Sequence, residues 1–135
     1  MKISISTTVN APIETVWNAW TAPEHITSWN FASDEWQCPT ATNDLRVGGT
    51  FSSRMEAKDG SMGFDFEGTY TQVDRHKLIA YKLADDRIVR IEFHTDGNST
   101  KVTEHFDTED THTAEQQRDG WQAILDNFKS YTESL

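Results

Sequence analysis

A chain of 135 residues matches one ordinary domain, since domains cluster at roughly 100 to 150 residues, and we expect a single domain over residues 1–135. Twelve Lys and Arg oppose 22 Asp and Glu, which gives a formal charge of −10 that would repel a phosphate backbone or an anionic lipid surface. Nucleic acid and membranes are therefore not expected as partners, and the five Trp, three Tyr and seven Phe indicate a folded, aromatic-rich core.

The first third of the chain is typical of a strand followed by two short helices. Residues 2–9 begin with Ile alternating with Ser, as in a half-buried strand. Pro12 suits the first position of a helix because its missing N–H would be unpaired there, and apolar residues follow at helical spacing. Pro23 begins a second short helix. In the segment that follows, we place Trp36 and Cys38 on one side of a short strand.

The middle of the chain changes to a period of two, which predicts strands. Apolar and polar residues alternate from Phe51 onward, after a Gly-Gly pair. The Asp59-Gly60 pair is a strong signal for a hairpin turn. Further alternating segments recur about every ten residues up to Phe106, with short polar turns between them. This pattern predicts an antiparallel meander with an apolar inner face and a solvated outer face.

The last segment predicts the longest helix. Thr113 and Gln116 have the spacing of a capping box, and one apolar stripe runs from Ala114 to about Glu133. Gly120 inside this helix costs about 1 kcal/mol relative to Ala, so we expect it to let the helix backbone approach the sheet closely. The predicted fold is α+β: a curved antiparallel sheet wrapped on the C-terminal helix, with two short helices after the first strand and a pocket between sheet and helix.

Four segments in fixed order carry a resemblance to a known family: VNAPIETVWNAWTAPEHITSW, DLRVGGTF, DGSMGFDFEGTY and FDTEDTHTAEQQRDGWQAILDNF. Together they resemble bacterial proteins related to the activator of the heat-shock protein 90 ATPase, within the START-like or SRPBCC superfamily, from about Ile3 to Tyr131. The resemblance implies a helix-grip fold with a ligand-sized cavity. For the small bacterial members it implies no settled biochemical activity. The eukaryotic co-chaperones carry a separate N-terminal domain that this short chain lacks.

Glu104 breaks the apolar pattern of its strand. It lies between Val102 and Phe106 on the inward side, where an ionised carboxylate is costly unless it is paired or hydrogen-bonded. One interpretation is structural: Glu104 bonds Gln117 or Arg118 at the start of the last helix, or a bulge turns it outward. The other is functional, because a single polar anchor in an apolar cavity is typical of a small-molecule site.

We therefore predict that a small, largely hydrophobic molecule, aromatic or lipid-like, binds between the sheet and the last helix without a cofactor. The candidate ligand-binding residues are Phe51, Met55, Phe66, Tyr70, Tyr81, Phe93, Glu104, Phe106, Trp121, Leu125 and Phe128. A cyclase- or dehydratase-like enzyme with Glu104 as general base is one alternative. A chaperone partner is another, and an exposed patch with Trp20 and Trp29 would favour it. The oligomeric state stays open.

We assign no functional site to the remaining reactive residues. Asp107, Glu109, Asp110 and His112 form an acidic run that lacks the glycine and the regular spacing of a calcium loop, so no metal is assigned. Cys38 is a lone thiol, which we interpret as a small hydrophobe without an intrachain disulfide. The sequence shows no apolar leader and no run long enough to span a bilayer, so we expect a cytoplasmic protein.

Overall fold

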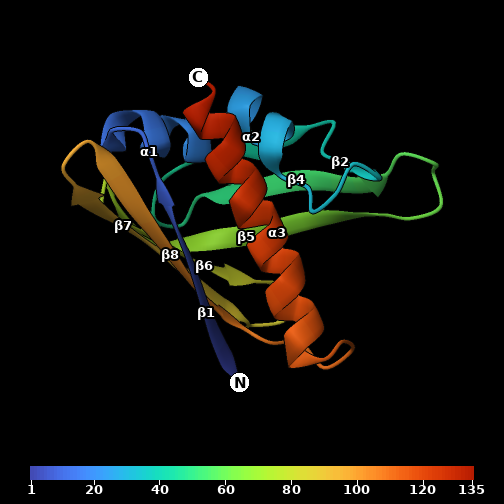
Figure 1. Ribbon diagram of the computed structural model, residues 1–135. Coiled ribbons are helices and arrows are strands. Elements are labelled where there is room, and N and C mark those ends of the chain that lie inside the picture. Colours follow the sequence, from blue (N-terminus) through green and yellow to red (C-terminus); the bar gives the residue numbers. More distant parts are fainter.

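An antiparallel sheet curls around the C-terminal helix in the computed structural model, which describes residues 1–135 (Figure 1). The elements in chain order are β1 (Lys2–Val9), α1 (Ile13–Thr21), α2 (Pro23–Trp29), β2 (Trp36–Gln37), β3 (Ala41–Asn43), β4 (Thr50–Ala57), β5 (Gly63–Asp74), β6 (Leu78–Leu83), β7 (Ile88–Asp96), β8 (Ser99–Asp107) and α3 (Ala114–Glu133). The predicted α+β helix-grip fold is confirmed.

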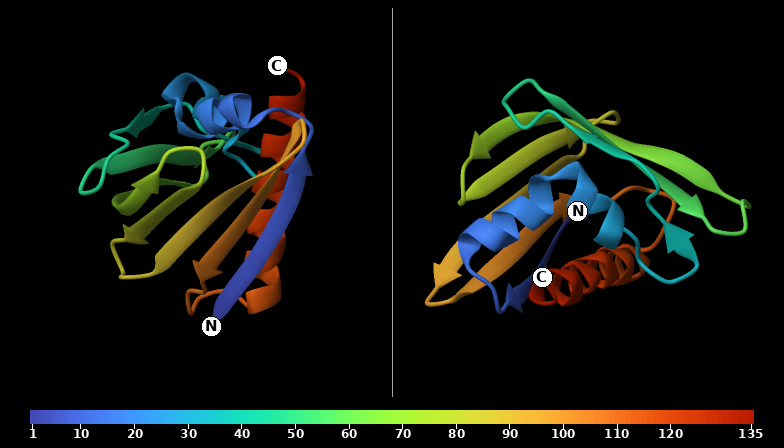
Figure 2. Two further views of the ribbon diagram at one scale, coloured as in Figure 1. Left: turned by 90° about the vertical axis from the view of Figure 1, so that its left-hand side faces the viewer. Right: turned by 90° about the horizontal axis from the view of Figure 1, so that it is seen from above.

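The strands follow the meander that the two-residue period predicts. Their order in the sheet is β1-β8-β7-β6-β5-β4-β2, and β3 pairs with β4. All pairs are antiparallel, and β1 pairs with β8 from Lys2 opposite Asp107 to Val9 opposite Thr100. Figure 2 shows α1, α2 and α3 on the concave side of the sheet. No helix combines the length and the hydrophobicity that crossing a bilayer requires.

The helix boundaries follow the local signals with one small difference. Pro23 is the first residue of α2, as predicted, whereas Pro12 has extended backbone angles and precedes the first residue of α1. At the start of α3, the hydroxyl of Thr113 accepts from the backbone N–H of Gln116, whose side chain accepts from the N–H of Thr113. The predicted capping box is confirmed.

The expected role of Gly120 is wrong. A Cβ added at this position would meet no atom within 4 Å. The buried side of α3 is formed by other residues, among them Gln117, Leu125 and Phe128, and Gly120 lies away from it. The helix therefore approaches the sheet through these side chains, and the glycine is not needed for contact.

The core lies between α3 and the sheet, where α3 packs on β1 and stacks Trp121 on Phe106 of β8. Phe106 and Phe128 are its largest fully buried side chains. Trp20 of α1 and Trp29 of α2 place their rings against Phe128, with centroids 4.8 and 4.9 Å from it. The two short helices thus add their tryptophans to the interior next to α3.

Candidate functional site

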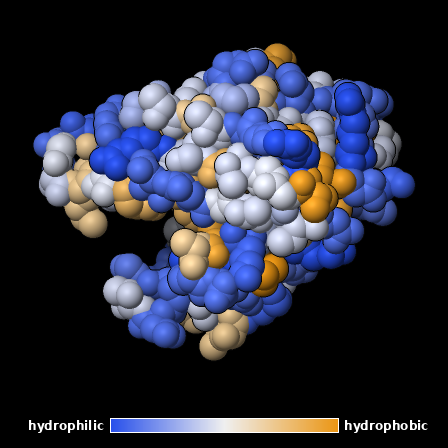
Figure 3. Space-filling view, turned by 180° about the vertical axis from the view of Figure 1, so that it is seen from behind, coloured by the Kyte–Doolittle hydropathy of each residue, from blue (hydrophilic) through white to orange (hydrophobic).

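A cavity of about 350 Å³ lies between the sheet and α3, within the size range of small-molecule sites. Twelve of its 21 lining residues are hydrophobic and come from all three helices and from β4, β5 and β6. The polar lining residues come from β3, β4, β8, α3 and the loops. Figure 3 shows the molecule hollowed between two projections, the upper one being the β4–β5 hairpin. Strand β8 contributes Glu104 to the lining, whereas β1 and β7 contribute no lining residue.

The structure divides the predicted site residues into two groups. Seven line the cavity: Phe51, Met55, Phe66, Tyr70, Tyr81, Glu104 and Trp121. The other four do not line it and belong to the core: Phe93, Phe106, Leu125 and Phe128. An inward direction along a strand or helix is shared by core and cavity residues, so the sequence pattern alone does not separate them. The structure therefore moves these four residues from the cavity wall to the core.

A glycine shapes the aromatic wall on β4 and β5. Gly68 stands opposite Phe51 in the strand register, and a Cβ at Gly68 would lie only 2.6 Å from the Phe51 ring. The space left by the missing side chain lets the Phe51 ring lie over the glycine. In this position Phe51 contacts Tyr81 edge-on, with centroids 4.7 Å apart, and Tyr70 at 5.4 Å. The glycine thus fixes one side of the cavity.

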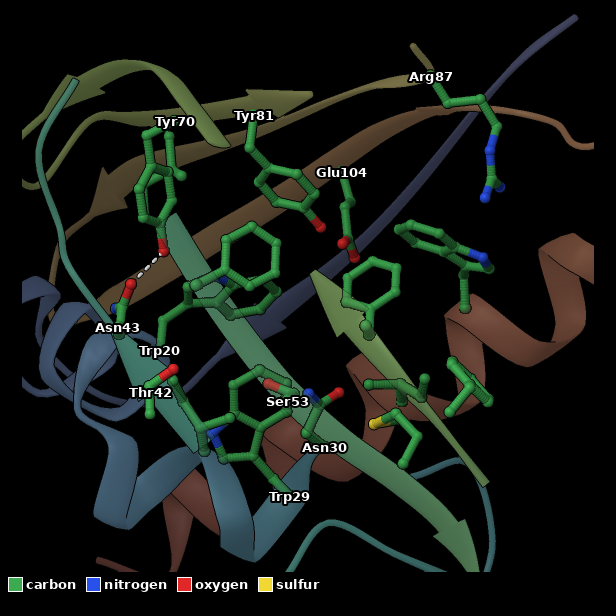
Figure 4. Close-up of a pocket in the computed structure, with 18 of the residues that line it drawn as sticks. Trp20, Trp29, Asn30, Thr42, Asn43, Ser53, Tyr70, Tyr81, Arg87 and Glu104 are labelled. Atoms are coloured by element: carbon green, nitrogen blue, oxygen red, sulfur yellow. Dashed lines mark hydrogen bonds between the residues drawn. The ribbon is translucent and has the colours of Figure 1, made fainter. Parts of the chain in front are cut away.

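Glu104 stands on the inner face of the sheet. Its register partners are the fully apolar Ile5 on β1 and Ile91 on β7, and the residue is only 6% exposed. Figure 4 shows its carboxyl group and the hydroxyl of Tyr81 pointing into the same part of the cavity. Burial raises the pKa of Glu104 to about 8, because water no longer stabilises the charged form.

Neither structural explanation proposed for Glu104 holds. Gln117 uses its side-chain N–H groups on the carbonyl oxygens of His112, at 2.8 Å, and Glu109, at 3.1 Å. Arg118 is exposed and forms no ion pair, and the strand carries no bulge at Glu104. The carboxyl group therefore faces the cavity without a protein partner.

A second polar group lies at the other end of the cavity (Figure 4). The Tyr70 hydroxyl donates to Oδ1 of Asn43 at 2.5 Å, and Nδ2 of Asn43 donates to the carbonyl oxygen of Thr21 at 2.7 Å. Burial raises the pKa of the Tyr70 phenol. This chain of bonds joins β5 to β3 and to the end of α1, so it holds the cavity wall together.

The family described as "Activator of Hsp90 ATPase homolog 1-like protein" matches residues 10–133. The chain belongs to this family. An AHSA1-like protein from Aeromonas hydrophila, solved by solution NMR, is 47% identical, with a TM-score of 0.92 and coverage of 99% of this chain and 93% of that one. Chr148 from Cytophaga hutchinsonii is 53% identical, with a TM-score of 0.85 and coverage of 98% of this chain and 92% of that one.

More distant structures share the fold alone. CV1439 from Chromobacterium violaceum is 22% identical, with a TM-score of 0.88 and coverage of 98% of both chains. No curated protein matches the chain. The family resemblance inferred from the sequence is confirmed by the family match and by the Aeromonas hydrophila structure, and CV1439 shares the fold at low sequence identity.

The AHSA1-like cavity includes residues that the sequence interpretation did not assign to it. They are Trp20, Ile26, Trp29, Asn30, Thr42, Asn43, Ser53, Phe64, Ile79, Arg87, Glu109, His112, Gln117 and Ile124. The two-residue period could have found Ser53, because it shares a strand face with Phe51 and Met55. No local signal places α1 and α2 over the cavity, since that depends on how the helices pack.

The tryptophans of the two short helices are not a surface patch. Trp29 is 4% exposed, and its indole N–H donates to the carbonyl oxygen of Ala19 at 2.8 Å. Trp20 is half-buried and lines the cavity. The exposed patch that would have favoured a chaperone partner is therefore absent, because both rings turn inward.

Charged residues of two loops line the cavity beside its apolar wall. Arg87 precedes β7, and its Nε donates to Asp85 at 2.7 Å. His112 precedes α3, and its backbone N–H donates to Glu109 at 2.7 Å. Asp107, Glu109, Asp110 and His112 do not form a cluster that could hold a metal ion. Asp107 instead accepts a hydrogen bond from the backbone N–H of Ile88 at 2.8 Å.

A serine, a histidine and a glutamate meet on the outer face of the sheet. The Ser4 hydroxyl lies 2.6 Å from Nδ1 of His105, whose Nε2 lies 2.9 Å from Glu92. Hydrolase triads use these residue types, but there the serine bonds Nε2 of the histidine and the carboxylate bonds Nδ1, which is the reverse of this arrangement. None of the three lines the cavity. We therefore assign this group to cross-strand stabilisation.

Proposed function

We propose that this AHSA1-like protein binds a small, largely apolar molecule, aromatic or lipid-like, in the cavity between the sheet and α3. The observation that carries the proposal is an apolar cavity of about 350 Å³ with one buried carboxyl group, that of Glu104, which has no hydrogen-bond or ion-pair partner in the protein. Apolar walls with a few polar groups are typical of small-molecule sites. Glu104 supplies orientation, while Phe51, Phe66 and Trp121 supply contact area.

A neutral aromatic probe tests this proposal. N-phenyl-1-naphthylamine has a non-basic nitrogen and becomes fluorescent in apolar surroundings. We expect saturable binding with one site per chain. An absence of saturation would contradict the proposal, and native mass spectrometry of the undenatured protein would identify any molecule that co-purifies.

A pair of variants on one strand locates the probe. Ser53 faces the cavity from β4, whereas Ser52 faces the opposite side of the sheet. Ser53→Leu should fill part of the void and weaken probe binding about tenfold, while Ser52→Leu should leave it within about twofold. Equal effects of the two changes would place the probe outside the cavity.

A second candidate function is supported by the state of Glu104. Its pKa of about 8 suits a general base or acid near neutral pH, as in a cyclase- or dehydratase-like enzyme. Such an enzyme would co-purify with product, and its Glu104→Gln variant with unconverted substrate. If the bound molecule released from both proteins has the same mass and the same chromatographic retention, conversion by Glu104 is excluded and binding remains as the function.

A further inference from the structure

The Glu104 carboxyl group has no cationic partner in the protein, because the two basic lining residues pair with other carboxylates: Arg87 with Asp85 and His112 with Glu109. The sheet places the Tyr81 hydroxyl near the Glu104 carboxyl group (Figure 4), and the lining residues of α3 are Gln117, Trp121 and Ile124, none of which is cationic. Arg87 is held by Asp85, and Figure 4 shows its guanidinium well to the side of the Glu104 carboxyl. A buried carboxylate is costly without a hydrogen-bonded or cationic partner.

Resting on the proposed function, we propose that the ligand is a hydrophobic amine whose protonated nitrogen pairs with the Glu104 carboxylate while its apolar body lies among the aromatic rings. The ligand then supplies the cationic partner that Glu104 lacks in the protein. The ammonium group would donate hydrogen bonds to the carboxylate, and ionic hydrogen bonds of this kind are stronger than neutral ones.

The aromatic rings of Phe66, Tyr81 and Trp121 in the cavity lining suit a cation as well as an apolar body. Phe66 lies edge-on to both Tyr81 and Trp121, with centroid distances of 6.3 and 6.1 Å. A cation within about 6 Å of an aromatic face is attracted by the ring, and the attraction grows when water is excluded. Cages of aromatic rings are a common way to hold ammonium groups.

The same arrangement disfavours anionic ligands. A fatty acid or an aromatic carboxylate would place a second negative charge near Glu104 and near the electron-rich ring faces. The formal charge of −10 also favours the approach of cations over anions. Among apolar molecules of equal size, the cavity should therefore rank amines first and acids last.

Three naphthalene probes of nearly equal size test the ranking by calorimetry at pH 8.5: 1-naphthylmethylamine, 1-naphthalenemethanol and 1-naphthoic acid. We expect the amine to bind about tenfold more tightly than the alcohol, and the acid to bind most weakly. Glu104→Gln should reduce amine affinity about tenfold and leave alcohol affinity within about threefold. Retained alcohol binding shows that the variant is folded.

A pH series on the wild type provides a test that needs no Glu104 variant. Other titratable or charged groups facing the cavity are Tyr70 and Tyr81 from the sheet, Arg87 before β7, and Glu109 and His112 before α3; β1 and β7 oppose Glu104 with isoleucines. Since the carboxyl must lose its proton to pair with an ammonium, amine affinity should rise up to about tenfold per pH unit below about 8 and then level off. His112→Asn should keep this slope.

The outcomes separate the two proposals. If none of the three probes binds, the proposed function fails. If the alcohol or the acid binds as tightly as the amine, or if amine affinity does not change between pH 6 and 8, the amine inference is overturned while hydrophobic binding stands. An amine preference that survives Glu104→Gln would also overturn it.

Discussion

The indole of Trp121 lies flat on the ring of Phe106, with centroids 4.1 Å apart and an angle of 9° between the planes. This stack joins α3 to β8 two residues beyond Glu104. Phe106 is fully buried, whereas Trp121 is half-buried and lines the cavity. Trp121 is therefore attached to the core through one ring face and available to the cavity through the rest of its surface.

The first prediction follows from this position. Saturation with N-phenyl-1-naphthylamine should quench tryptophan emission, and Trp121→Phe should remove a large share of the quenching because its ring borders the cavity. Trp20 and Trp29 also line the cavity, so some quenching should remain. Trp36, on β2, is outside the lining, and Trp36→Phe is the matched control. Equal loss in both variants would contradict the assignment of Trp121.

The second prediction concerns stability and pH. Glu104 has a pKa of about 8 in the folded chain against an ordinary value of 4.5, so the folded state holds an extra proton between these values. Stability should therefore fall as pH rises through this window, by at most about 1.4 kcal/mol per pH unit, with the loss complete above pH 8. Glu104→Gln should lack this fall and become the more stable protein toward pH 8.

Urea denaturation of both proteins at several pH values measures the difference directly. Glu133 offers the opposite case, because the backbone N–H of Asn10 and the ammonium of Lys129 lower its pKa. The stability that this carboxylate contributes is lost only as pH falls below its ordinary range. Glu133→Gln should therefore show no pH-dependent difference from the wild type between pH 5 and 8. A parallel pH profile for wild type and Glu104→Gln would refute a raised pKa.

The third prediction addresses the glycine under Phe51. Gly68→Ala should push the Phe51 ring toward the cavity, reduce probe affinity and destabilise the fold by about 1 to 3 kcal/mol. Gly63→Ala is the control on the same strand, where the new methyl group would meet mainly the flexible Arg54 side chain. Unchanged probe binding in Gly68→Ala would show that the ring does not define the cavity wall.

The fourth prediction concerns Gly120. Since no atom lies within 4 Å of an added Cβ, Gly120→Ala should raise the free energy of unfolding by about 1 kcal/mol. The same substitution at Gly97, where φ is +62°, should destabilise the chain instead. Thermal unfolding of both variants decides the matter, and a destabilised Gly120→Ala protein would contradict the space seen at this helix position.

Local patterns were enough to predict the strands from β4 to β8, their hairpins and the helices, because these depend on nearby residues, whereas β3 and the pairing of β1 with β8 were not predicted. The two-residue period also placed Glu104 on the inner face of β8, with Phe106 beside it. The position of the cavity could not be predicted from these patterns. Phe106 and Phe66 both point inward, and only the distance between the sheet and the helices decides that Phe106 lies in the core and Phe66 lines the cavity. The same limit applies to Trp20, whose place depends on how α1 packs against α3.

The pairing of β1 with β8 has a consequence for the order in which the chain folds. Ile5 lies opposite Glu104, so the first strand to be synthesised has its partner almost a hundred residues later. Closing so long a loop costs entropy before the new contacts offset it. During synthesis on the ribosome, β1 has no strand partner until β8 has emerged, and α3 emerges after β8. Because β8 and α3 contribute Glu104 and Trp121 to the cavity, the cavity is completed late, and a ligand can bind only after both elements have been synthesised.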